Sequence, residues 1–175
     1  MNTDNAFDFS TAAAPGSRIE EIQEKINEQV TLRIIRFTPE KPSQRPTVIF
    51  VAGWISRIQG WVEVLQEMTR DFPVIYVETR EKISSQINGK TGFGVEDIGG
   101  DLAEVAERYI APGKPYLMLG SSLGATAILD CYAALKQKPV QLTLIGPNAV
   151  FRVPLLWKLF LRPFYPRLYL LIKPV

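Results

Sequence analysis

The run Gly120-Ser121-Ser122-Leu123-Gly124 constrains the fold of this chain more than any other feature. It follows an apolar stretch, residues 115–119, and precedes a helix-forming stretch, residues 125–129. The two glycines that flank Ser122 allow a tight and strained turn, because neither carries a Cβ that would block it. The pattern therefore predicts a strand, a sharp turn and a helix, with Ser122 raised above the end of the strand.

Apolar runs and helical spacings alternate along the rest of the chain. Residues 47–52 form a continuous apolar, β-branched run, which is typical of a parallel strand buried on both faces. Residues 18–28 fit either a helix or the first strand of a hairpin, and 83–94 are expected to form a mobile loop. The alternation predicts an α/β fold with a mostly parallel sheet and helices on both faces. The remaining strands are expected at 29–37, 74–77, 115–119 and 141–145, and the helices near 61–68, 95–110 and 125–136.

The order of these elements over residues 29–175 resembles the α/β-hydrolase superfamily. The likeness is carried by the strand ending in Ala52-Gly53-Trp54, the strand and exit at 74–80, the turn at 120–124, and the strand ending in Ile145-Gly146-Pro147. Ala52 stands where relatives often have a histidine, which is usually a loop-packing residue.

The resemblance also implies a division of the chain into three parts. Residues 1–17 would be a flexible lead-in, 18–149 a partial α/β-hydrolase core, and 150–175 the start of a helical cap. The last strands of the family's sheet, which usually carry the catalytic acid and histidine, would then belong to sequence not present here.

By the same resemblance, Ser122 is the catalytic nucleophile. The backbone N–H groups of Leu123 and Trp54 would form the oxyanion hole, and Gly120 and Gly124 would be the glycines of the nucleophile elbow. The implied substrate is a small apolar acyl compound, a carboxylic ester or thioester, cleaved through an acyl-enzyme.

The chain contains no histidine, so it lacks the base that a serine nucleophile normally uses. Lys90 and Lys114 are chemically conceivable bases, but their spacing does not support either. Asp97 and Asp101 are expected to be solvated or capping residues. Three functions stay open. The chain is part of a serine hydrolase and inactive in isolation, or it is a non-catalytic module of the same fold that binds a lipid or a partner, or it is an acyltransferase or thioesterase that acts on a carrier.

Composition excludes several other classes of function. A net charge of +2 argues against nucleic acid as a partner. The sequence has no dinucleotide fingerprint, phosphate loop or Cys/His cluster, so neither a metal nor an organic cofactor is expected. With no long apolar run and no signal-like N-terminus, a cytoplasmic location is expected. The one cysteine, Cys131, is expected to fill the core. The oligomeric state stays open.

Residues 150–175 differ from the rest of the chain. All 18 acidic residues lie at or before Asp130, so this segment carries basic and aromatic side chains without any acid. Three interpretations stay open: the start of a cap over an apolar pocket, a peripheral membrane or lipid contact, or a loose end.

Overall fold

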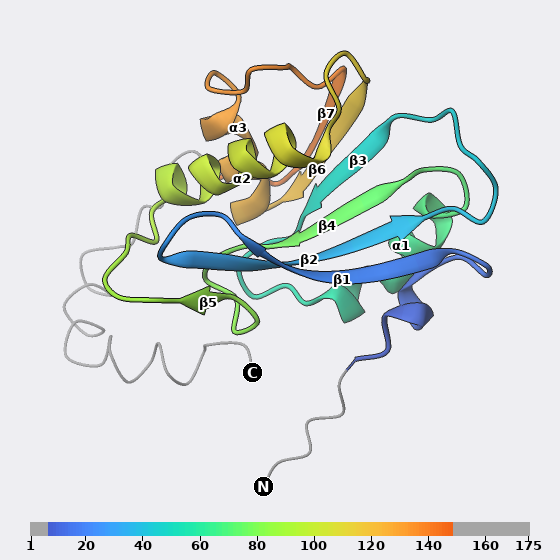
Figure 1. The fold of residues 1–175 in the computed structure, drawn as a ribbon, viewed down its shortest axis with the longest axis horizontal. Coiled ribbons are helices and arrows are strands. Elements are labelled where there is room, and N and C mark those ends of the chain that lie inside the picture. The colour runs from blue at the N-terminus through green and yellow to red at the C-terminus, as the bar shows by residue number, and fades with distance from the viewer. Residues whose placement is uncertain (1–6, 149–175) are drawn as a thin grey trace, which may run out of the picture.

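The computed structural model describes residues 7–148, which form one seven-stranded sheet with helices on both faces (Figure 1). The strands are β1 (Arg18–Lys25), β2 (Val30–Thr38), β3 (Thr47–Val51), β4 (Val74–Glu78), β5 (Gln86–Ile87), β6 (Tyr116–Ser121) and β7 (Gln141–Ile145). The helices are α1 (Val62–Met68), α2 (Val95–Tyr109) and α3 (Leu123–Cys131), with 3-10 turns η1 (Phe9–Ala12) and η2 (Ile58–Trp61).

The sheet follows the order β1-β2-β4-β3-β6-β7, with β5 paired to β2. Strands β4, β3, β6 and β7 are parallel to one another, whereas β2 is antiparallel to β1, β4 and β5. The predicted α/β class with a mostly parallel sheet is confirmed. The open choice at 18–28 is decided in favour of a hairpin strand, because Arg18 to Lys25 pair along β2.

Both faces of the central strands are buried, and this explains their continuous apolar character. In β3, Ile49 and Val51 pack on the side of α2 and α3, whereas Val48 and Phe50 pack on the side of α1 and η1. All four side chains are at most 2% exposed. A strand covered on both sides has no position for a polar side chain, so the run shows no alternation.

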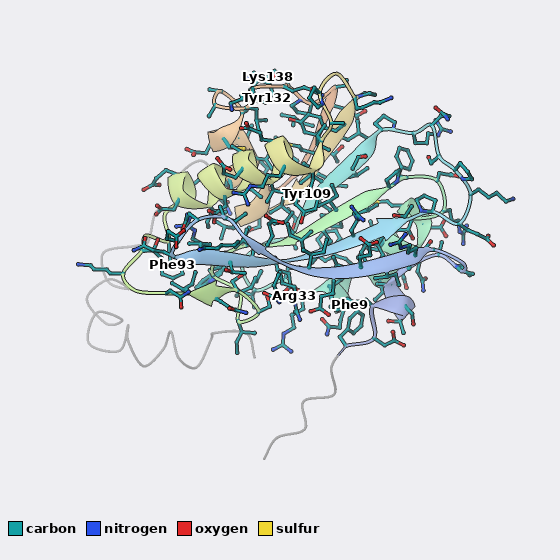
Figure 2. The ribbon with its side chains drawn as sticks, viewed as in Figure 1. Phe9, Arg33, Phe93, Tyr109, Tyr132 and Lys138 are labelled. Atoms are coloured by element: carbon teal, nitrogen blue, oxygen red, sulfur yellow. The ribbon has the colours of Figure 1, made fainter. Side chains whose placement is uncertain are left out.

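The N-terminal stretch is packed against the body over most of its described length, although a flexible lead-in was expected at 1–17. Ala12 is fully buried, and the Ala14 N–H donates to Thr69 Oγ1 at 2.8 Å. The Arg33 guanidinium lies 5.6 Å from the centre of the Phe9 ring (Figure 2). The expectation of flexibility rested on a local Ala-Pro-Gly cluster, whereas the packing comes from residues far along the chain.

Several element ends differ from the sequence pattern. Helix α3 ends at Cys131 rather than near residue 136, and residues 86–87 pair with β2 inside the expected loop. Cys131 is 3% exposed, as expected of a core filler.

The expected cap, residues 150–175, lies outside the described residues. Within residues 7–148, no helix is long and apolar enough to cross a membrane.

Candidate active site

Ser122 has a strained backbone at the junction of β6 and α3. Its φ and ψ are 48° and −115°, and it is the one non-glycine residue with positive φ in the described part of the chain. Residues with a Cβ rarely adopt this conformation. Two hydrogen bonds hold it there: the Ser122 N–H donates to the Ile145 carbonyl at 2.8 Å, and the Thr126 N–H donates to the Ser122 carbonyl at 3.0 Å. The Ser122 side chain is thereby held at the exposed carboxyl end of β6.

The glycines on either side of Ser122 are required by packing. A Cβ on Gly120 would lie 2.7 Å from the backbone of Ala125, and one on Gly124 would lie 2.3 Å from the Val51 carbonyl oxygen. Gly120 therefore lets α3 fold back over β6, and Gly124 lets α3 approach the end of β3. The sharp turn that the sequence predicts depends on both contacts.

The loop after β3 lies directly beside this turn. The Gly53 N–H donates to Ser121 Oγ at 3.0 Å, and a Cβ on Gly53 would lie 3.1 Å from Ser122 Cβ. Trp54 follows at once, with 36% of its surface exposed. Among the described residues, neither the Trp54 N–H nor the Leu123 N–H has a hydrogen-bond acceptor. The structure thus places the loop that carries Trp54 beside the strained serine, which Leu123 follows directly in the chain.

Comparison with known proteins bears on the fold. No protein-family model and no curated protein sequence matches this chain. Solved structures do match: a proposed lipase from Acinetobacter baumannii AYE gives a TM-score of 0.67 at 18% identity, covering 95% of this chain and 55% of that protein. A hydrolase from Pseudomonas aeruginosa PA01 gives 0.65 at 16%, covering 85% of this chain and 53% of that one. The Cif epoxide hydrolase from Acinetobacter nosocomialis gives 0.59 at 20%, covering 75% and 38%.

The chain has the α/β-hydrolase fold. It spans about half the length of the first two of these proteins and less of the third. At identities of 20% or less, the likeness establishes the architecture alone. Strands β4, β3 and β6 form a parallel part of the sheet. Ser122 and the loop after β3 lie at the carboxyl ends of these strands.

A buried lysine supports the loop after β3, and it was not among the residues singled out from the sequence. Lys82 is 8% exposed, and its Nζ donates to the carbonyls of Gly53 at 2.5 Å, Ser56 at 3.1 Å and Trp54. Burial lowers its pKa, and the nearby Glu81 carboxylate, 3.6 Å away, opposes this effect. The one available signal was position, since Lys82 follows the end of a buried strand, where site residues of open α/β sheets collect.

Other charged groups at this end of the sheet form structural pairs. Arg80 makes a two-pronged ion pair with Asp101, each bond 2.7 Å long, and both side chains are buried. Asp97 accepts the Gly94 N–H at 2.9 Å and caps α2. The expected role is therefore found for Asp97, but Asp101 is neither solvated nor a cap. Its burial follows from Arg80, which approaches from a different element.

Neither lysine that was considered as a base is placed to serve Ser122. Lys114 precedes β6, whereas Ser122 follows it, and six strand residues separate the two ends by about 20 Å. Lys90 is exposed, and its carbonyl accepts a hydrogen bond from Gln29 beside the hairpin. Asn148 lies close to the turn, since its N–H donates to Thr126 Oγ1 at 3.0 Å, but an amide cannot act as the acid of a triad.

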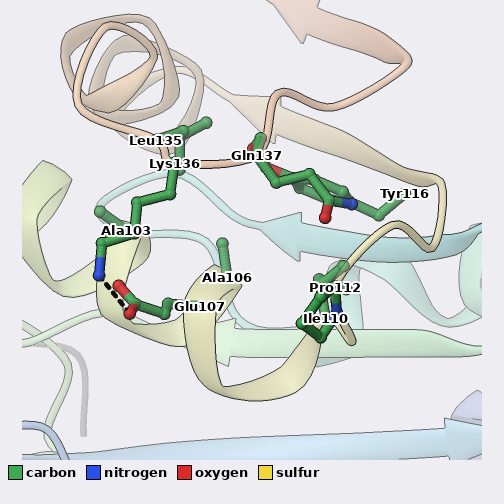
Figure 3. Close-up of a pocket in the computed structure, with 9 residues that line it drawn as sticks. All are labelled: Ala103, Ala106, Glu107, Ile110, Pro112, Tyr116, Leu135, Lys136 and Gln137. Carbon is green, nitrogen blue, oxygen red and sulfur yellow. Dashed lines mark hydrogen bonds and ion pairs between the residues drawn. The ribbon is translucent and has the colours of Figure 1, made fainter.

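A hollow of about 250 Å³ lies at the opposite end of the sheet (Figure 3). It opens between the end of α2 and the start of β6, and an ion pair between Lys136 and Glu107 lies along it. Tyr116, the first residue of β6, lines it. Because Ser122 follows the last residue of that strand, this hollow is not an acyl pocket for the candidate nucleophile.

Proposed function

We propose that this chain carries the nucleophile and the oxyanion hole of a serine hydrolase that cleaves small apolar esters or thioesters. The observation that carries the proposal is the strained backbone of Ser122, with Leu123 next to it in the chain and the loop that carries Trp54 beside it. Backbone strain of this kind costs free energy and persists where the surrounding structure enforces it. The fold of the solved lipase and hydrolases supports the same proposal.

The chemistry follows from these groups. Ser122 Oγ attacks the carbonyl carbon of the acyl group while its proton passes to a base, and the carbonyl oxygen becomes an oxyanion. The N–H groups of Leu123 and Trp54 stabilise that oxyanion, each by about 3 kcal/mol where such donors have been measured. The positive end of α3 adds to this field. The protonated alcohol or thiol then leaves, and water releases the acyl group from Ser122 by the same steps in reverse.

An imidazole base would have to come from outside these 175 residues, since they contain no histidine. Lys82 does not replace it, because its ammonium directs its three donors at three carbonyls. By itself this chain should retain only the part of catalysis that the oxyanion hole and binding supply, about 10³-fold over water.

The proposal is tested with a fluorophosphonate, which Ser122 Oγ would attack with loss of fluoride. At about pH 9, hydroxide replaces the missing base, so labelling reports the activation of the serine by its surroundings. Labelling of Ser122 in the folded chain should be about 100-fold faster than in the chain unfolded in urea. Ser121, the neighbouring residue in the same peptide, is the internal control, and Ser122→Ala should remove the label. Equal rates for the folded and unfolded chains would refute the proposal.

The absence of histidine also favours a second candidate, a binding module of the same fold without catalysis. In this case Trp54 and Leu123 would hold an oxygen of a ligand that is never cleaved. The sequence of residues 150–175, which is basic and aromatic without any acid, favours a lipid as the partner of such a module. Cosedimentation with phospholipid vesicles, with and without that segment, tests it, and equal pelleting of both chains would count against it.

A further inference from the structure

We infer that Lys82 is a positioning residue that sets the conformation of the oxyanion loop, residues 53–56, and so directs the Trp54 N–H. The inference rests on the proposed function and adds to it a residue that does not touch the substrate. Lys82 lies beyond the end of β4, and the loop follows β3, the strand next to it in the sheet. The two are 26 to 29 residues apart in the sequence.

The direction of the Trp54 N–H follows from the geometry of a peptide bond. The carbonyl of Gly53 and the N–H of Trp54 belong to the same peptide unit, which is trans here. In a trans peptide the C=O and N–H bonds point in opposite directions. Because Lys82 binds the Gly53 carbonyl, the Trp54 N–H must point away from the ammonium.

The other side of the loop is bound to the nucleophile turn. Gly53 donates its N–H to Ser121 Oγ, so the loop is held between Ser121 on one side and Lys82 on the other. One further bond closes the loop, from the Ser56 N–H to the Gly53 carbonyl at 3.1 Å. The Trp61 indole N–H also donates to Ser56 Oγ at 2.7 Å.

An ammonium is well suited to this position. The carbonyls of Gly53, Trp54 and Ser56 converge on a single buried point, and their partial negative charges repel one another unless a cation lies between them. Lysine supplies three donors from one atom and has no acceptor. A methionine side chain would keep most of the apolar stem but leave the carbonyls of Trp54 and Ser56 without a partner and the Gly53 carbonyl with only the Ser56 N–H. A buried polar group without a partner is costly. The loop should then rotate its peptide units toward water.

The test compares Lys82→Met with Arg80→Met, a control that removes an equally buried cation from the same strand exit. Arg80 binds Asp101 and the Gly92 carbonyl and has no hydrogen bond to the loop. Hydrogen exchange of the Gly53 and Ser56 amides, measured by NMR, should be about tenfold faster in Lys82→Met than in the unsubstituted chain. In Arg80→Met, the exchange of these two amides should change no more than the global free energy of unfolding does. Fluorophosphonate labelling of Ser122 should slow about 10- to 100-fold in Lys82→Met, because one oxyanion donor is misdirected.

A rescue experiment separates positioning from simple loss of packing. In Lys82→Ala, added ethylammonium should restore protection of the two amides and labelling of Ser122, whereas tetramethylammonium, which has no N–H donor, should restore neither.

Three outcomes would overturn the inference: unchanged exchange of the two amides in Lys82→Met, equal opening of the loop in Arg80→Met, or faster exchange with no change in the labelling rate. Failure of the unsubstituted chain to label at Ser122 would instead refute the proposed function. It would also refute the expected effect of Lys82 on the reactivity of Ser122. The exchange measurement would still decide which residue holds the loop.

Discussion

Replacing Gly124 by alanine should destabilise the fold strongly. The new Cβ would lie 2.3 Å from the Val51 carbonyl oxygen and 2.8 Å from that of Ala52. Carbon and oxygen atoms normally approach to about 3.3 Å, so α3 and the end of β3 must separate by about 1 Å. Both oxygens belong to backbone at the end of a central strand, and neither can rotate away as a side chain would.

The expected cost is at the upper end of that of overpacking, about 3 kcal/mol. The helix preference of alanine over glycine offsets at most about 1 kcal/mol of this, so the net loss is about 2–3 kcal/mol. With a urea m-value of about 2 kcal/mol/M, the unfolding midpoint should fall by about 1–1.5 M.

The assay is urea unfolding followed by circular dichroism, with Gly100→Ala in α2 as the matched control. A Cβ at Gly100 would meet no atom within 4 Å, so this substitution should raise the midpoint by up to about 0.5 M. A Gly124→Ala midpoint equal to that of the unsubstituted chain, with the same m-value, would refute the claim that close approach of α3 to β3 requires glycine.

Two further predictions concern strain and pH. Ser122→Gly should be about 1–2 kcal/mol more stable than Ser122→Ala in urea unfolding, because glycine adopts the positive φ without the strain that alanine keeps. Neither variant should accept the phosphonate label. Equal stability of the two variants would show that the turn is unstrained. Burial, with Asp130 as a lesser cause, raises the pKa of the Cys131 thiol from 9.0 to about 11. The unfolded chain therefore loses this proton first, and the free energy of unfolding should fall by about 2 kcal/mol between about pH 9 and 11. Cys131→Ala should show a shallower slope in this range, and an identical slope would contradict the assignment.

Much of the fold could be predicted from the sequence because its signals are local. After Thr47, the run has no polar position through residue 52, and this is typical of a strand with both faces covered. The turn at Ser122 could also be predicted, since the two glycines that permit it lie within two residues of the serine. The resemblance drawn from these elements led to the fold that the solved structures share.

The tertiary structure decided which loops and charges meet. Asp101 was expected near solvent, yet Arg80, 21 residues earlier, draws it into the interior. Lys82 looks like an ordinary charge in a polar run, and its three carbonyl partners become visible only when the ends of β4 and β3 lie side by side. Hydrophobic periodicity records which face of an element is buried, and this is a local property. A contact between two loops depends instead on strand order and register, which arise from the whole sheet, so no short stretch of sequence contains it.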